Sequence, residues 1–139
     1  MSDSLRRFVP MHEAQFETAL SEIESGWKRT HWMWYIFPQL RGLGHSSMAW
    51  EYGIRDLEEA RAFLADPYLG GNLIRISRAL LRLNTNRAGD VFGPPDDLKL
   101  RSSMTLFAAA AGGDSVFREG LEKYFGGQPD PRTMGMLGW

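Results

Sequence analysis

An aromatic segment at residues 27–40, WKRTHWMWYIFPQL, holds polar side chains among several large rings. Aromatic faces can stack on a flat ligand ring, and a few fixed polar groups can orient it. Histidine titrates near neutral pH, so His31 could serve as a general acid or base. We therefore predict a ligand site to which this segment contributes Lys28, His31, Trp32, Trp34, Tyr35 and Gln39. The competing interpretation is a core element whose polar atoms find partners inside the protein.

The loop that follows, RGLGHSS at residues 41–47, combines two glycines with basic and hydroxyl side chains. Glycine lets the backbone approach a ligand closely, and free N–H groups at the start of a following helix attract anions. A phosphate-binding role is therefore predicted for Arg41, Gly42, Gly44, His45 and Ser46. The loop lacks the third glycine of a dinucleotide fingerprint and the lysine of a P-loop. It therefore also fits an ordinary connection with a serine cap.

Glu51 is the isolated acidic residue of the sequence MAWEYGI. A carboxyl group in an aromatic setting, here beside Tyr52, can work as an acid or base, and cleavage of a glycosidic bond needs such a group. We predict Glu51 as a catalytic residue together with His31, and Tyr52 as a ligand contact. In the alternative interpretation, Glu51 faces solvent on a helix and pairs with Arg55 four residues later.

Two further groups of polar residues could face a ligand. Lys99 and Ser103, in the sequence DLKLRSSMT, could line a polar cleft beside the aromatic segment. Alternatively, they belong to a capped helix start in which Ser103 bonds back to its own helix. Arg75, Arg78 and Arg82 recur on one side of a predicted helix, where they could contact phosphate. This stripe is more typical of the solvated face of an amphipathic helix.

The composition excludes several classes of site. The 139 residues contain no Cys, which rules out a disulfide framework, a thiolate zinc site and a Cys nucleophile. The three His, at positions 12, 31 and 45, share no metal-ligand spacing, so we predict no metal and no other cofactor. A net charge of −1 gives no general attraction to nucleic acid. No apolar run has the length of a signal peptide or membrane span. We therefore expect a cytoplasmic protein without a membrane partner, and an oligomer remains compatible with the composition.

Apolar residues at helical spacing, separated by Gly and Pro, indicate an all-α fold. We expect one compact domain over residues 1–139, with residues 1–9 as an N-terminal arm and about six helices joined by short loops. The stretch VFGPP, at residues 91–95, is predicted to be a break. Side chains that can cap a helix mark several predicted helix starts: Ser46 or Ser47, Asp56 followed by Glu59, Asp96 or Asp97, Asp114 and Asp130.

Two long motifs, HWMWYIFPQLRGLG and DDLKLRSSMTLF, resemble a bacterial family of small cytoplasmic proteins of unknown function that are often labelled calpastatin. The shorter motifs YGI, PYLG and VFGPPDD support this resemblance, which runs from Phe8 to about Leu137. The family implies no settled activity, and the repetitive, disordered character of calpastatin is absent here. In size, helical class and its early aromatic segment with a histidine, the chain also resembles the NADAR family, helical proteins linked to NAD, ADP-ribose and related N-glycosides.

These features give two hypotheses from different functional classes. In the first, a pocket around Trp32, Trp34 and Tyr35 holds a nucleotide- or ADP-ribose-like small molecule, and His31 or Glu51 helps to hydrolyse an N-glycosidic bond. The hydrolysis rests on the NADAR resemblance as much as on the residues, so whether the protein is an enzyme stays open. In the second, the same aromatic residues form the core or interface of a non-catalytic interaction or oligomerisation module.

Overall fold

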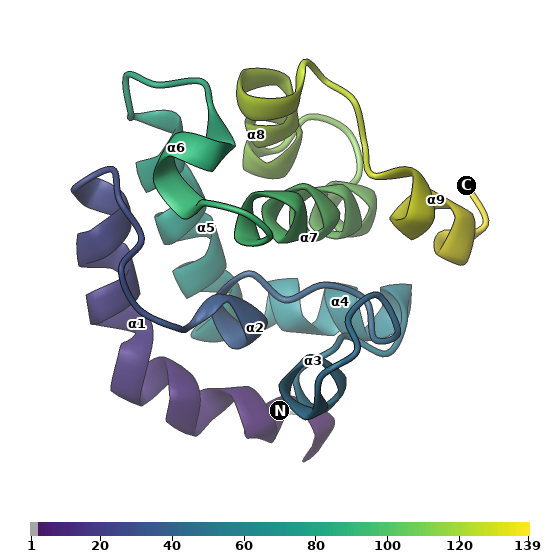
Figure 1. Cartoon of the computed structure of the whole chain (residues 1–139). Coiled ribbons are helices and arrows are strands. Elements are labelled where there is room, and N and C mark those ends of the chain that lie inside the picture. The colour runs from purple at the N-terminus through teal and green to yellow at the C-terminus, as the bar shows by residue number, and fades with distance from the viewer. Residues whose placement is uncertain (1–2) are drawn as a thin grey trace.

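Short helices make up nearly all the regular structure of residues 3–139, which the computed structural model describes (Figure 1). In chain order they are a 3-10 helix at Asp3–Phe8, α1 (Val9–Glu24), α2 (Met33–Ile36), α3 (Ser47–Glu51), α4 (Leu57–Ala65), α5 (Leu69–Leu81), α6 (Ala88–Phe92), α7 (Asp96–Ala111), α8 (Val116–Phe125) and α9 (Pro131–Leu137). Within these residues the only β pairing is an isolated bridge between Leu40 and Ile54. The predicted all-α class is confirmed.

The predicted number of about six helices is wrong, because residues 3–139 form nine α-helices. The helices α2, α3 and α6 have only four or five residues, too few to show a helical repeat of apolar positions. Part of the predicted break at residues 91–95 is helical, since α6 continues to Phe92. None of the helices described is long and apolar enough to cross a lipid bilayer.

Three of the predicted helix caps are confirmed. The side chains of Ser46, Asp56 and Asp130 each accept a hydrogen bond from a backbone N–H in the first turn of the following helix. Such a bond satisfies one of the N–H groups that a helix start leaves without an intrahelical partner. These residues therefore fix where α3, α4 and α9 begin.

Two other predicted caps are wrong. The cap of α8 is Ser115, not Asp114, because two glycines at positive φ lengthen the connection from α7 and α8 begins one residue later. Pro95 precedes α7 without a side-chain cap, and Asp96 and Asp97 lie inside its first turn. Acidic side chains are favourable there because the N-terminal end of a helix carries a partial positive charge.

The helix α7 lies at the centre of the molecule, where it contacts α4, α6, α8 and α9 (Figure 1). Residues 102–107 of α7 are all buried, since neighbouring helices cover several of its sides. Phe63 of α4 and Phe117 of α8 pack against Phe107, with ring centroids 5.5 and 5.7 Å away. The helix α5 packs beside them against α1, α4 and α8. The buried hydrophobic residues form one continuous core.

The predicted N-terminal arm is folded onto the domain. Phe8 is fully buried and meets Phe63 edge to face, with the ring centroids 5.0 Å apart. The Arg7 guanidinium donates to the Glu59 carboxylate at 2.9 Å and to the Gly53 carbonyl at 2.8 Å. Burial raises the pKa of Glu59, but the hydrogen bonds from Arg7 and other donors outweigh burial and hold this pKa at about 2. Residues 1 and 2 of the arm lie outside the described residues.

His12 of α1 is buried, and both of its ring nitrogens have partners. Nε2 lies 2.8 Å from the Tyr35 carbonyl oxygen, and Nδ1 lies 3.1 Å from the side-chain amide nitrogen of Asn72. This arrangement fits a neutral ring that donates from Nε2 and accepts at Nδ1. Burial lowers the pKa of His12, although the hydrogen bond to Tyr35 opposes that shift.

Acidification below pH 6.5 is therefore expected to destabilise the protein. In the unfolded chain His12 takes up a proton as the pH falls through 6.5, whereas the folded ring stays neutral to a lower pH. The free energy of unfolding then falls by up to about 1.4 kcal/mol per pH unit within that window. Urea unfolding at about pH 7.5 and about pH 5.5 measures this loss. His12→Gln should show a smaller loss than the wild type, and an equal loss in both proteins would assign the effect to other groups.

Ser77 of α5 is 1 % exposed, and its hydroxyl has no hydrogen-bond partner among the described residues. A buried hydroxyl without a partner costs about 1–3 kcal/mol, so Ser77→Ala is expected to raise the free energy of unfolding by about 1 kcal/mol. Chemical denaturation of the two proteins measures the difference. Ser102→Ala is the matched control, because the Ser102 hydroxyl donates to the Leu98 carbonyl at 3.2 Å and its loss should bring no gain. Destabilisation by Ser77→Ala would contradict the prediction.

Candidate functional site

Two of the predicted stacking rings lie inside the core. Trp32 is fully buried, and its indole Nε1 donates to the Glu22 carboxylate at 3.0 Å. Tyr35 is 2 % exposed, and its hydroxyl lies 3.3 Å from the His31 carbonyl oxygen. Both rings therefore pack against protein atoms, which is the alternative role that the sequence left open for this segment.

Four of the predicted ligand contacts do meet at one place. They line a hollow of about 10 Å³, roughly the space that one water molecule needs. A nucleotide does not fit into this volume. The four residues are Trp34, Gln39, Tyr52 and Lys99.

The lysines beside the aromatic segment are held by Asp96 at the start of α7. Lys28 Nζ lies 2.9 Å from an Asp96 carboxylate oxygen, and the Lys28 side chain is only 6 % exposed. Lys99 Nζ lies 3.6 Å from the other oxygen and 5.6 Å from the centre of the Trp34 ring. Both ammonium groups pair with the half-buried Asp96. The pairing with Lys28 therefore holds the aromatic segment against the start of α7.

The two predicted catalytic residues lie apart from the small hollow. His31 is exposed in the connection between α1 and α2. Glu51 is exposed at the last position of α3, and its carbonyl oxygen accepts a hydrogen bond from Arg7 at 2.7 Å. Its expected pairing with Arg55 is not formed, because the Arg55 guanidinium lies 3.4 Å from Asp56 instead.

In the predicted phosphate loop, the main polar side chains are engaged with the protein. The Arg41 guanidinium donates to the Trp50 carbonyl at 2.9 Å and lies 4.8 Å from the centre of the Trp50 ring. The Ser46 hydroxyl caps α3. Gly42 and His45 are exposed.

The two remaining predicted contacts, Gly44 and Ser103, are less exposed than Gly42 and His45. Gly44 is half-buried, and a Cβ atom there would lie 2.6 Å from the Ala49 Cβ. Ser103 is 1 % exposed within α7. Neither Gly44 nor Ser103 lines the small hollow.

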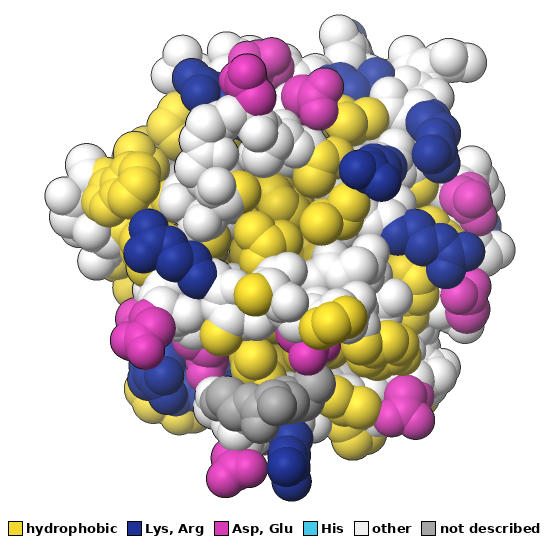
Figure 2. Space-filling model, turned by 180° about the vertical axis from the view of Figure 1, so that it is seen from behind, with side chains coloured by type: hydrophobic (Ala, Val, Ile, Leu, Met, Phe, Trp, Pro, Cys, Tyr) yellow, Lys and Arg dark blue, Asp and Glu magenta, His cyan; other side chains and the backbone are white. Residues whose placement is uncertain are grey.

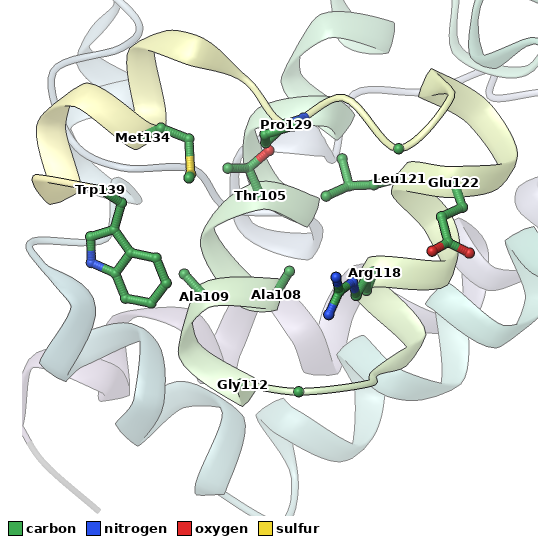
Figure 3. Close-up of a pocket in the computed structure, with 12 residues that line it drawn as sticks. Thr105, Ala108, Ala109, Gly112, Arg118, Leu121, Glu122, Pro129, Met134 and Trp139 are labelled. Carbon is green, nitrogen blue, oxygen red and sulfur yellow. The ribbon is translucent and has the colours of Figure 1, made fainter.

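A larger groove, which we call the α7–α9 groove, lies between α7, α8 and α9 (Figure 3). Its volume is about 430 Å³, within the range of small-molecule sites. Ala108 and Ala109 of α7 lie in its middle, with the Trp139 ring on one side and the Arg118 side chain on the other (Figure 3). Thr105 and Met134 lie towards one end (Figure 3).

Hydrogen bonds to α7 position the chain that closes this groove. The Thr105 hydroxyl donates to the Arg101 carbonyl at 2.8 Å and accepts from the Asp130 N–H at 2.8 Å. The Arg101 guanidinium donates to the carbonyls of Gln128 and Pro129. These bonds hold the segment before α9 against α7, so α9 begins beside the groove.

Glycines keep the groove open. Gly112 ends α7 with a φ of +69°, and Gly113 and Gly127 also have positive φ. All three line the groove without a side chain that could fill it. The glycine pairs on both sides of α8, Gly112–Gly113 and Gly126–Gly127, are the sequence signal for this site.

Two charged side chains of α8 line the groove, and both were missed as site residues from the sequence. Arg118 and Glu122 lie one turn apart and are exposed. Within residues 3–139 neither forms a salt bridge. The groove therefore presents one cation and one anion along one wall, neither of them in a salt bridge. In the same part of the chain, no group of three or more His, Asp or Glu side chains could hold a metal ion.

Comparison with known proteins identifies the family. Residues 2–137 match the family described as "Protein of unknown function (DUF1810)". The chain is 45% identical to the conserved hypothetical protein Rv1873 from Mycobacterium tuberculosis; the match covers 97% of this chain and 96% of that one, and the structures agree with a TM-score of 0.94. No curated protein matches the chain. The calpastatin label and the NADAR resemblance stay predictions, whereas the match over nearly the whole length shows that the chain belongs to the DUF1810 family of proteins of unknown function.

Proposed function

We propose that this protein binds a small organic molecule with a flat apolar ring and a negatively charged group in the α7–α9 groove. One observation carries the proposal: an unpaired Arg118 guanidinium and an exposed Trp139 ring face the same groove of about 430 Å³ (Figure 3). Each of these groups suits one part of such a ligand.

The apolar part of the ligand belongs at the α9 end of the groove. The Trp139 side chain is 61 % exposed, so its indole face is free to stack on another ring. Ala108 and Ala109 are small and leave a flat floor beside it. Stacking on a tryptophan is worth about 1–3 kcal/mol for a nucleobase-like ring.

The charged part of the ligand belongs at Arg118. A guanidinium group binds carboxylate and phosphate through two parallel hydrogen bonds. Glu122, one turn away, can accept hydrogen bonds from hydroxyl groups of the ligand. A nucleotide combines a ring, hydroxyl groups and phosphate. We therefore keep the nucleotide-like class of ligand that the sequence predicts and assign it to this groove.

Binding fits the groove better than hydrolysis. Cleavage of a glycosidic bond generally uses two carboxyl groups that flank the bond. Among the described residues that line the groove, Glu122 is the only one with an acidic side chain. The predicted catalytic residues are His31, in the connection between α1 and α2, and Glu51, at the end of α3; they line neither this groove nor the small hollow.

A non-catalytic interaction module remains the second candidate, because several large hydrophobic side chains are exposed. Trp50 is 61 % exposed and Met136 is 51 % exposed. Figure 2 shows hydrophobic side chains gathered across the middle of the face seen from behind, between scattered charged ones. Tryptophan and methionine are enriched at protein interfaces.

A thermal-shift screen tests the proposal with nucleoside monophosphates, nucleoside diphosphates and aromatic carboxylates, and with uncharged nucleosides for comparison. A ligand at about one hundred times its Kd adds about 2.7 kcal/mol to the free energy of unfolding, a shift of several degrees. We expect a shift from ring-bearing anions and none from the uncharged nucleosides. Lys99→Ala and Glu51→Gln should keep the shift, since neither residue lines the groove. No shift from any ring-bearing anion, or a shift that Lys99→Ala removes, would contradict the proposal and favour the interaction module.

A further inference from the structure

A second hollow adjoins the α7–α9 groove between α5 and the start of α8. Its volume is about 400 Å³, and its lining includes Arg78, Asp114 and Glu119. It shares Arg118 and Glu122 with the groove. Because the same two side chains belong to both hollows, a ligand held at Arg118 can extend from one into the other.

The second hollow adds a second cation to the site. Arg78 is exposed, and within residues 3–139 neither it nor Arg118 forms a salt bridge. Arg75, one turn earlier on α5, lies 3.3 Å from Glu17 and is partly neutralised. Each of these two guanidinium groups can bind one of two linked anionic groups, as in a diphosphate, although the same lining also holds three carboxylates, Asp114, Glu119 and Glu122.

The same hollow also carries acidic side chains, which suit an uncharged part of the ligand. Asp114 and Glu119 are exposed and have no salt bridge in the described part of the chain. A further anion beside them would be repelled. Uncharged hydroxyl groups donate hydrogen bonds to carboxylates without adding charge, as sugar hydroxyls do to acidic residues in dinucleotide sites.

We infer that the ligand extends through both hollows and is a nucleoside diphosphate sugar. Its base stacks on Trp139, its diphosphate lies between Arg118 and Arg78, and the hydroxyl groups of its terminal sugar reach Asp114 and Glu119. The inference rests on the proposed function, because it needs the ring and the first phosphate to bind in the α7–α9 groove. To the proposed ring-bearing anion, the inference adds a second phosphate and a terminal sugar.

Isothermal titration calorimetry with two series of compounds tests the inference. One series is UMP, UDP and UDP-glucose, and the other is AMP, ADP and ADP-glucose. In at least one series, we expect the affinity to rise about tenfold from the monophosphate to the diphosphate, and again about tenfold from the diphosphate to the diphosphate sugar. Each gain is that of one added charge-assisted hydrogen bond or one set of hydrogen bonds from hydroxyl groups.

Two variants locate the steps. Arg78→Ala should weaken the diphosphate and the diphosphate sugar about tenfold while leaving the monophosphate unchanged. Glu119→Ala should bring the diphosphate sugar down to the affinity of the diphosphate. Arg82→Ala is the matched control, because Arg82 lies one turn beyond Arg78, is exposed and lines neither hollow. All three residues are exposed, and thermal unfolding without ligand checks that each variant folds.

Either of two results would overturn the inference. Equal affinity of the diphosphate and its sugar derivative in both series, unchanged in Glu119→Ala, removes the extension into the second hollow and leaves the proposed function standing. Absence of binding by all six compounds removes the proposed function and the inference together.

Discussion

Glu22→Ala is expected to lower the free energy of unfolding by about 3–5 kcal/mol. The Glu22 side chain is buried at the end of α1 and accepts hydrogen bonds from the N–H groups of Arg29 and Thr30, the Thr30 hydroxyl and the Trp32 indole, at 2.6–3.0 Å. Alanine leaves all these donors without their acceptor, and the Trp32 indole is fully buried. Chemical denaturation measures the loss.

The control for this variant is Glu24→Ala. Glu24 is exposed on the same helix, so its replacement should change the free energy of unfolding by less than about 0.5 kcal/mol. A loss below about 1 kcal/mol for Glu22→Ala would contradict the assignment of Glu22 as the acceptor that holds the connection between α1 and α2.

The same carboxylate should make the protein sensitive to acid. Burial raises the pKa of Glu22, but the hydrogen bonds from Thr30, Arg29 and Trp32 outweigh burial and lower this pKa from 4.5 to about 2. Because the folded pKa lies below the unfolded one, the stabilisation of about 3 kcal/mol is present above pH 4.5 and is lost as the pH falls towards 2. Glu22→Ala should therefore lose less stability than the wild type over that window.

Arg118→Ala is expected to weaken binding of ring-bearing anions by about 10–100-fold, the loss that follows removal of hydrogen bonds between charged groups. The exposed guanidinium forms no salt bridge within residues 3–139, so the variant should keep the thermal stability of the ligand-free protein. Arg118→Lys keeps the charge but loses the paired hydrogen-bond geometry, and an intermediate affinity is expected. Calorimetric titration with the tightest compound of the screen measures all three proteins.

Arg132→Ala is the control for that comparison, since Arg132 is an exposed arginine of α9 that does not line the groove. Its affinity should equal that of the wild type. Equal losses in Arg118→Ala and Arg132→Ala would indicate general charge attraction instead of a specific contact.

The fold class could be predicted because its main signals are local. The apolar stripe of α5 and the caps Ser46, Asp56 and Asp130 each depend on residues only a few positions apart. The helix α6 was missed because it has five residues and is stabilised by contacts with α7 rather than by its own pattern.

The candidate site was harder to predict because its signals are not local. A buried core and a ligand pocket use the same aromatic residue types, and the role of the aromatic segment is shown by the burial of Trp32 and Tyr35 and by the pairing of Lys28 with Asp96, far along the chain. The α7–α9 groove depends on the hydrogen bond between Thr105 and Asp130, which sets where α9 lies. Spacing along the sequence does not reveal such a contact.

Ligand binding in the α7–α9 groove is tested most directly by NMR. Backbone amides and tryptophan indoles are followed while the wild-type protein is titrated with UDP or ADP. We expect saturable shifts for the amides of Gly112, Gly113 and Gly127 and for the Trp139 indole, which line the α7–α9 groove. Shifts centred instead on Lys99 and the residues around the small hollow, or no saturable shift with either compound, would contradict binding in the α7–α9 groove.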